Sequence, residues 1–195
     1  MASAPAAALL PDEGELLRRA RNGDSAAWAG IYAQYQPPIM RFCRHALGHR
    51  EDAEDAAAEV LFKVRLALDR FDLSRPFAPW LYRVAANHCL DILRRRSRQM
   101  RSEDDIETVA ITQPGQDQLE RLIQRQSGER VRAALERLPA RARMVLLLRY
   151  YSELSYDEIA LALAVPRPYV GVLLLRARQS LREAFEESEA PGGEA

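Results

Sequence analysis

The stretch Arg75–Arg101 constrains the fold most, because it combines helical periodicity with a strong concentration of charge. It contains seven arginines and a single acidic residue, Asp91. Read as a helix from Pro76, its apolar residues recur every three or four positions and share one face. That face holds Phe77, Trp80, Leu81, Val84, His88 and Ile92. Another face holds Arg83, Asn87, Asp91, Arg94 and Arg98.

Two interpretations of this helix are open. A row of arginines with hydrogen-bonding neighbours suits a surface that follows a phosphate backbone. The same pattern also describes an amphipathic helix whose charged face is only solvated. Trp80 has two interpretations as well: its place on the apolar face favours core packing, and a stacking platform for a base is the alternative.

The remainder of the chain predicts an all-α fold, because no segment shows the alternation of a half-buried strand. Glycine and proline fall between the helical patterns. We expect Pro37–Pro38 to break or kink a helix, since proline removes a backbone donor and clashes with the preceding turn. The predicted helices are Glu13–Arg21, one capped by Asp24, Ile39–Leu47, Arg50–Phe71, the helix from Pro76, one from near Leu119 to Pro139, Arg141–Tyr151, Tyr156–Ala164 and one from Pro168.

Charge is segregated along the chain although the formal net charge is zero. Residues 1–101 hold 16 basic and 12 acidic side chains, and residues 102–129 hold seven acids against two arginines. Residues 130–182 hold ten arginines against four acids, and residues 183–195 hold five acids and no base. Two basic blocks separated by an acidic spacer favour two polyanion-binding modules on a linker over one compact enzyme.

The sequence shows few of the features expected of an enzyme or a membrane protein. Cys43 and Cys89 lie far apart with no paired ligands at metal spacing, so we expect two core thiols in a reducing cytoplasm. We expect no cofactor, no metal and no catalytic residue, because there is no glycine-rich phosphate loop and the three histidines form no acid–base group. No apolar run approaches a membrane span, and the N-terminus does not resemble a signal peptide.

The second half contains a helix-turn-helix pattern. Ser155 and Glu158 form the capping-box spacing just before an apolar run. The tight turn Val165–Arg167 follows, and a second helix starts at Pro168, a residue favoured in a first helical turn. This spacing predicts a helix-turn-helix whose second helix carries basic residues.

Several stretches, in order and at the right spacing, resemble the sigma-70 family of bacterial RNA polymerase sigma factors, extracytoplasmic-function (ECF) group. ARNGDSAAWAGIYAQYQPPIMRFC, HREDAEDAAAEVLFKV and ALDRFDLSRPFAPWLYRVAANHCLDILRRR resemble region 2, and ERLPARARMVLLLRYYSELSYDEIALALAVP resembles region 4. The resemblance implies two small helical domains, a region 2 bundle and a region 4 helix-turn-helix, on a flexible acidic linker. Its expected boundaries are 1–11 (disordered), 12–101 (region 2), 102–118 (linker), 119–185 (region 4) and 186–195 (acidic tail).

The resemblance implies that the acidic helix docks on core RNA polymerase, at the clamp helices of β′, with the β flap as a further contact. Acidic side chains would meet basic partners and apolar ones would pack there. The expected docking residues are Asp52, Asp55, Glu59, Val60, Leu61, Lys63 and Val64. Ala58 departs from the glutamine usual at that position of the family.

The resemblance also implies that the turn Asp69–Arg75 and the following helix recognise and melt the −10 region of promoter DNA. The free-energy cost of opening a duplex is offset only when the protein captures the exposed bases and the strand that carries them. The expected −10 residues are Asp72, Ser74, Arg75, Trp80, Arg83, Asn87, Arg94, Arg95 and Arg98.

For the −35 element the resemblance implies major-groove reading by the last helix, with Arg167, Tyr169, Gly171, Val172, Leu173, Leu175, Arg176 and Arg178. If Val170, Leu174, Ala177 and Leu181 face inward, then Gly171, Val172, Leu173 and Leu175 should be exposed. Apolar side chains can touch a thymine methyl group but give no hydrogen-bond readout. We therefore expect −35 recognition that is weak or based on shape, or an apolar patch that binds a protein.

The function implied is that of a cytoplasmic ECF sigma factor directing promoter-specific initiation, with an anti-sigma factor as a further partner and no membrane contact. A stand-alone helix-turn-helix regulator is one alternative, although it leaves the acidic helix and the Trp80 helix without a role. A protein that binds polymerase and has lost promoter reading is another.

Overall fold

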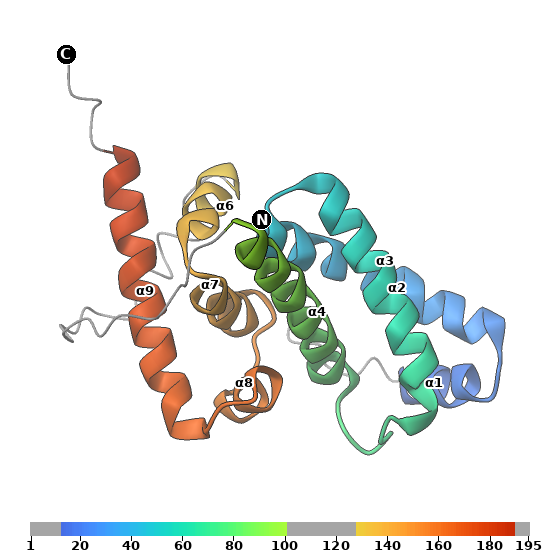
Figure 1. Ribbon diagram of the computed structural model, residues 1–195. Coiled ribbons are helices and arrows are strands. Elements are labelled where there is room, and N and C mark those ends of the chain that lie inside the picture. The colour runs from blue at the N-terminus through green and yellow to red at the C-terminus, as the bar shows by residue number, and fades with distance from the viewer. Residues whose placement is uncertain (1–12, 101–127, 190–195) are drawn as a thin grey trace, which may run out of the picture.

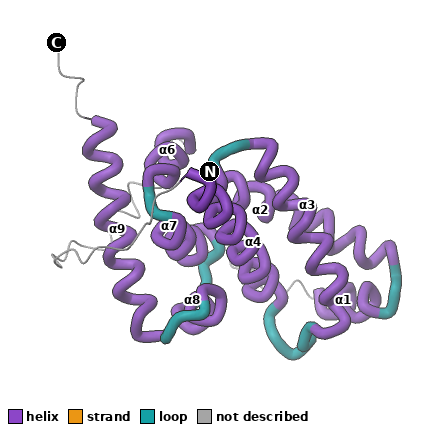
Figure 2. The backbone as a smooth tube through the Cα atoms, viewed as in Figure 1, coloured by secondary structure: helices purple, strands orange, loops and turns teal. Residues whose placement is uncertain are grey.

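The computed structural model describes residues 13–100 and 128–189, and its regular secondary structure in those ranges is entirely helical (Figures 1 and 2). The all-α prediction is therefore confirmed there. The segment 1–11, the linker 102–118 and the expected helix start near Leu119 lie outside the described residues.

The first half is a bundle in which α2 packs against both α1 and α3, and α4 packs against α2 and α3. Its core is filled by side chains such as Phe42, Leu61 and Phe77, each no more than 1% exposed. The Cys43 and Cys89 thiols meet in this core 3.8 Å apart, as predicted for buried thiols. The elements are α1 (Glu13–Arg21), α2 (Ser25–Leu47), α3 (Arg50–Ala67), the 3-10 turn η1 (Leu68–Arg70) and α4 (Phe77–Met100).

Of the break or kink predicted at Pro37–Pro38, a break is wrong, because α2 continues through both prolines, and a kink stays a prediction. Ile31 and Tyr35 before them and Ile39 after them are all buried on the same side. This continuous apolar face stabilises the helix across the site where two proline rings oppose it. The start of α2 agrees with the sequence: Asp24 Oδ1 accepts the backbone N–H groups of the first turn at 2.9 and 3.1 Å.

The second half forms the predicted helix-turn-helix. Ser155 caps α8 with both hydrogen bonds of the capping box to Glu158, and Ala164 ends the helix in the left-handed conformation. The last helix continues to Glu189, past residue 185 where the sequence predicted the domain to end. The elements are α6 (Gly128–Arg137), α7 (Ala140–Leu146), the π-helical turn η2 (Leu147–Tyr151), α8 (Tyr156–Leu163) and α9 (Arg167–Glu189).

The two halves pack directly on each other, with α4 between them (Figure 1). One side of α4 contacts α2 and α3, and the other contacts α7 and α8. Buried residues of both halves belong to one continuous hydrophobic core. The arrangement thus brings the basic helix predicted for −10 DNA against the helix-turn-helix.

Among the described helices, none is by itself long and apolar enough to cross a membrane, and α8 and α9 meet that test only as a pair bent by 91°.

Candidate nucleic-acid interface

The loop between η1 and α4 has a defined shape. Asp72 Oδ1 accepts hydrogen bonds from the Ser74 backbone N–H at 3.0 Å and the Ser74 hydroxyl at 2.7 Å. Arg75 Nε lies 3.4 Å from Asp72 Oδ2. The bonds from Ser74, and secondarily the charge of Arg75, lower the pKa of Asp72. Asp72 therefore acts first as an anchor of the loop, and the loop presents Arg75 toward solvent.

A pocket of about 270 Å³ opens beside this loop. The loop and the start of α4 provide most of its wall, and two residues of α8 complete it. Its lining combines cations with aromatic rings, which is the chemistry that binds a base and its phosphate. The lining residues are Arg70, Phe71, Asp72, Arg75, Pro76, Pro79, Trp80, Arg83, Glu158 and Leu161.

The core-packing interpretation of Trp80 is confirmed, and base stacking stays a prediction. Its ring packs against Phe71, with centroids 4.7 Å apart, and against Phe77 at 5.6 Å. The half-buried indole also lines the pocket. Core contacts therefore hold the ring in place while part of it faces the pocket.

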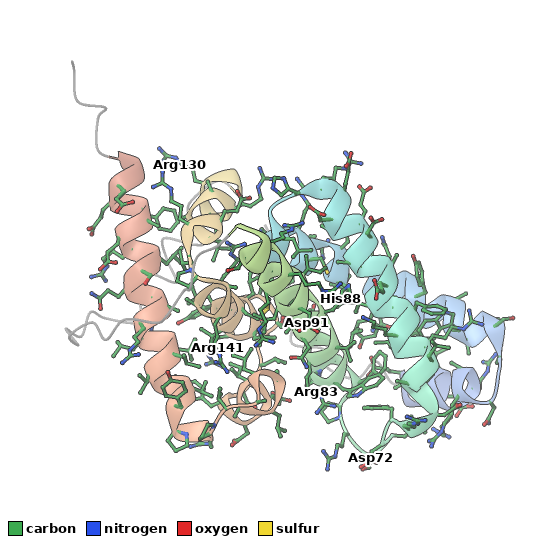
Figure 3. The ribbon with its side chains drawn as sticks, in the orientation of Figure 1. Asp72, Arg83, His88, Asp91, Arg130 and Arg141 are labelled. Atoms are coloured by element: carbon green, nitrogen blue, oxygen red, sulfur yellow. The ribbon has the colours of Figure 1, made fainter. Side chains whose placement is uncertain are left out.

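The polar face of α4 leads away from the pocket. Asn87, Asp91, Arg94 and Arg95 are exposed, whereas Arg83 is half-buried at the pocket end. Figure 3 shows Asp72 and Arg83 at one end of α4 and Asp91 farther along it. Of the predicted −10 residues, Arg98 alone lies in a part of α4 whose side chains are outside the described set.

Val60, Leu61 and Val64, predicted to face polymerase, instead fill the core of the first half with no more than 1% exposure. This part of the docking prediction is corrected, because these residues lie on the side of α3 that packs within the bundle. Asp52 is half-buried and paired with Arg96 of α4. Asp55 and Glu59 are exposed, as the docking prediction requires.

Two docking candidates were missed by the sequence reasoning. Phe62 is 60% exposed and Leu66 is 66% exposed on α3. Their spacing of four residues places them on one face, and Glu59, three residues before Phe62, lies on the same side of the helix. Counting from the acidic residues rather than from the apolar run would have found them.

Lys63 connects α3 to α4 through His88. Lys63 Nζ lies 3.0 Å from His88 Nδ1 and 2.9 Å from Glu59 Oε1. Because an ammonium group only donates, Nδ1 accepts, and the neutral ring carries its proton on Nε2, which lies 3.6 Å from Glu59 Oε2. Burial, and then the charge of Lys63, lower the pKa of His88.

In α9 the inward set is confirmed, since Val170, Leu174, Ala177 and Leu181 are no more than 1% exposed. The prediction that Leu173 is exposed is wrong: it is 4% exposed. Leu173 stands three residues after Val170 and four before Ala177, so it belongs to the same buried stripe. Gly171, Val172 and Leu175 are half-buried, which leaves a smaller apolar surface than the sequence suggested.

The polar residues predicted for the −35 element lie around this stripe. Arg167 Nε pairs with Asp157 at 2.8 Å, and Arg178 Nη1 donates to the Tyr150 hydroxyl at 3.3 Å. Tyr169 and Arg176 are half-buried. Both pairings are with residues of the second half, so they fix the two arginines relative to the helix-turn-helix.

A cationic and aromatic pocket beside a polar helix, joined to a helix-turn-helix, is an all-helical arrangement suited to binding nucleic acid. Comparison with known proteins specifies the class. Sigma-70 region 2 matches residues 31–99, and Sigma-70, region 4, matches residues 128–181. The chain belongs to the ECF group of the sigma-70 family of RNA polymerase sigma factors.

Two relatives illustrate the match. The chain is 33% identical over 167 residues to ECF RNA polymerase sigma factor SigD of Mycobacterium bovis. The aligned residues are 83% of this chain and 78% of the relative. It is 28% identical over 178 residues to ECF RNA polymerase sigma factor SigW of Bacillus subtilis. Those residues are 88% of this chain and 95% of the relative.

The fold is shared with two solved structures. CnrH in complex with the cytosolic domain of CnrY matches with a TM-score of 0.65 and 23% identity, over 91% of this chain and 99% of that one. The sigma factor RpoE in complex with the anti-sigma factor NepR from Bartonella quintana matches with a TM-score of 0.62 and 24% identity, over 81% and 96%.

Proposed function

We propose that this chain binds core RNA polymerase and directs initiation by capturing the −10 strand in the pocket between the η1–α4 loop and α4. The pocket itself carries the proposal, because it places Arg75, Trp80 and Arg83 around a space of about 270 Å³. An unstacked base can lie against the indole, and the arginines can hold its phosphates. The role is one of binding and strand separation, with no catalytic residue.

The exposed polar face of α4 extends this site along the strand. Asn87 can hydrogen-bond a base edge, and Arg94 and Arg95 can hold backbone phosphates. Arg94 lies 3.4 Å from Asp91 within α4, which limits its freedom before DNA binds. Asp72 and Ser74 contribute by fixing the loop.

For the −35 element we propose contacts dominated by shape and phosphate. Arg167, Arg176 and Arg178 supply positive charge, and Tyr169 supplies a hydroxyl. Val172 and Leu175 are half-buried and supply apolar contact only. Leu173 is no longer part of this surface, which also weakens the alternative that the helix serves as an apolar protein-binding patch.

The proposed polymerase surface is the exposed face of α3. Asp55 and Glu59 supply negative charge, and Phe62 and Leu66 supply apolar contact. Charge complementarity sets docking rate and register, while burial of two large side chains supplies affinity. The β′ clamp helices are the proposed partner, with the β flap as a second contact.

An anti-sigma factor is a further proposed partner. CnrH was solved with CnrY, and RpoE was solved with the anti-sigma factor NepR. This chain shares their fold, so a small partner protein that covers both halves is consistent with its architecture.

Run-off transcription with core polymerase tests the function. A sigma factor directs initiation on its own with core polymerase, a stand-alone regulator requires another sigma factor, and a polymerase-binding antagonist inhibits. Asn87→Ala and Arg94→Ala should reduce open-complex formation, scored by permanganate reactivity, while core-polymerase binding stays unchanged. An equal loss of open-complex formation and of core-polymerase binding would contradict the proposed role of α4.

A further inference from the structure

His88 of α4 faces the acidic helix α3 at the edge of the proposed docking face. Its side chain is 5% exposed, whereas the Glu59 side chain across from it is 54% exposed. Figure 3 shows His88 on the α3 side of α4. Packing therefore fixes the imidazole ring, while the Glu59 carboxylate extends from the docking face toward solvent.

Two routes connect the ring to Glu59. In the direct route, His88 Nε2 lies 3.6 Å from Glu59 Oε2. In the indirect route, Lys63 Nζ donates to His88 Nδ1 at 3.0 Å and lies 2.9 Å from Glu59 Oε1. Lys63 follows Glu59 by four residues, so it lies on the same face of α3. Each carboxylate oxygen is thus constrained, one by the ring and the other by an ammonium group that the ring holds.

The ring nitrogen that faces Glu59 is a buried donor without a hydrogen bond. Because Nδ1 accepts from Lys63, the neutral ring carries its proton on Nε2, and no described residue accepts that proton. Glu59 Oε2 lies just beyond hydrogen-bond distance. An unsatisfied buried donor costs free energy, so the N–H favours orientations of Glu59 that keep the carboxylate close to it.

We propose that His88 is a positioning residue for polymerase docking, which orients the Glu59 carboxylate toward a basic group of the polymerase, both directly and through Lys63. The proposal rests on the proposed docking role of Glu59 on α3. His88 is itself buried, so it acts through Glu59 rather than by touching the partner.

Orientation matters here because an exposed ion pair by itself is weakly held. Side-chain entropy and solvent screening oppose a pair such as Lys63 and Glu59, four residues apart on a helix surface. The buried ring of His88 supplies a fixed point that such a pair lacks. A carboxylate that is oriented before docking loses less side-chain freedom on binding, which improves affinity.

Asp55 provides an internal control on the same helix. It is exposed, it carries the same charge as Glu59, and it lies one helical turn earlier. Within the described parts of the chain, the charges that act on His88 come from α3 and α4, and they are Lys63, Glu59, Arg95 and Asp91. Asp55 is not one of them, so a substitution there should change docking independently of His88.

Two double-mutant cycles in the full-length chain test the proposal, with affinity for core polymerase measured by fluorescence anisotropy. His88→Leu removes both ring nitrogens and should weaken docking about threefold. In the Glu59→Gln background the same change should alter affinity by less than about 1.5-fold, because the carboxylate that His88 orients is gone. In the Asp55→Asn background the threefold loss should persist. His88→Gln keeps a neutral N–H donor and an acceptor, and it should dock like the parent protein.

A second measurement does not depend on the folding of His88→Leu. Burial, and then the charge of Lys63, lower the pKa of His88, whereas the charge of Glu59 raises it. Titration of the His88 ring by nuclear magnetic resonance should therefore show a lower pKa in Glu59→Gln than in the parent protein. Asp55→Asn should leave the His88 titration unchanged.

The outcomes separate the proposal from the docking role on which it rests. An equal effect of His88→Leu in the Glu59→Gln and Asp55→Asn backgrounds would overturn the positioning role, and so would a His88 pKa that Glu59→Gln leaves unchanged. If Glu59→Gln alone left the affinity for core polymerase unchanged, the proposed docking face would be wrong instead. The His88 titration would in that case still report whether the ring and the carboxylate are in contact.

Discussion

Arg143 Nη1, from α7, donates a hydrogen bond of 2.6 Å to the carbonyl oxygen of Ala46 in the last turn of α2. The same guanidinium donates through Nη2 to the carbonyls of Glu136 at 2.6 Å and Leu138 at 3.3 Å. A cation at a helix C-terminus is favourable because the last carbonyls lack intrahelical partners. Burial lowers the pKa of Arg143, and the nearby Glu136 charge opposes that shift. One buried arginine therefore ties the end of α2 to the connection between α6 and α7.

Arg143→Met should destabilise the protein by about 3 kcal/mol, because three carbonyls, two of them in buried hydrogen bonds, lose a charged donor. Urea unfolding followed by circular dichroism measures this loss. Arg141→Met is the matched control, since half-buried Arg141 makes a single 3.3 Å bond to the Leu163 carbonyl. Equal stability of the two variants would show that the contact with Ala46 is not formed in solution.

Much of the fold follows from local chemistry that a sequence displays. The Ser155 capping box and the Asp24 cap each need one short segment, and the structure confirms both. Helical spacing identified Val170 and Leu174 as buried for the same reason. These features depend on neighbours within about one helical turn, so the sequence is sufficient for them.

Other features depend on tertiary contacts. The two prolines in α2 are tolerated because Tyr35 and Ile39 are both buried on the same side of one helix. Val60 and Phe62 are both apolar, and only the packing of α3 decides that the first is buried and the second exposed. Arg143 gives no sequence signal that separates it from the surface arginines. Residues set by packing between distant elements were therefore the ones misassigned or missed.

Gly171→Ala should stabilise the protein by about 0.5 to 1 kcal/mol, because glycine weakens a helix interior relative to alanine. A Cβ atom at this position would meet only the Tyr156 ring, at an ordinary contact distance of 3.8 Å. Thermal unfolding of the full chain measures the change. Gly23→Ala is the opposite control: its φ of 89° strains any other residue, so it should lose stability. A loss in Gly171→Ala would mean that α9 is not continuous there.

Stability should fall as the pH drops below about 6.5, the ordinary histidine value. Burial lowers the pKa of both His88 and His45 in the folded state. The unfolded chain then binds more protons between the folded pKa and 6.5, so protonation favours unfolding across that window, and the loss is complete below the folded pKa. Glu59 and Asp91 moderate the effect at His88, whereas Lys63 and Arg95 add to it.

The measurement is urea unfolding between pH 8 and pH 5.5, a range chosen to lie above the ordinary carboxylate values. His88→Gln and His45→Gln should each reduce the pH slope, and the double variant should nearly remove it. His49→Gln is the control, because His49 is exposed. A pH slope that is the same in the parent protein and in all four variants would contradict the assignment.

Phe62→Ser and Leu66→Ser should each weaken binding to core polymerase about tenfold, since each removes a large apolar side chain from the proposed docking face. Fold stability should change by less than about 0.5 kcal/mol, because both side chains are already mostly exposed. Fluorescence anisotropy of labelled protein titrated with core polymerase gives the affinity.

Tyr32→Ser, at 42% exposure on α2, is the control for loss of an exposed aromatic. Leu61→Ser should instead unfold the bundle, because Leu61 is 1% exposed in its core. If Tyr32→Ser weakened docking as much as Phe62→Ser, the polymerase surface would lie elsewhere than on α3.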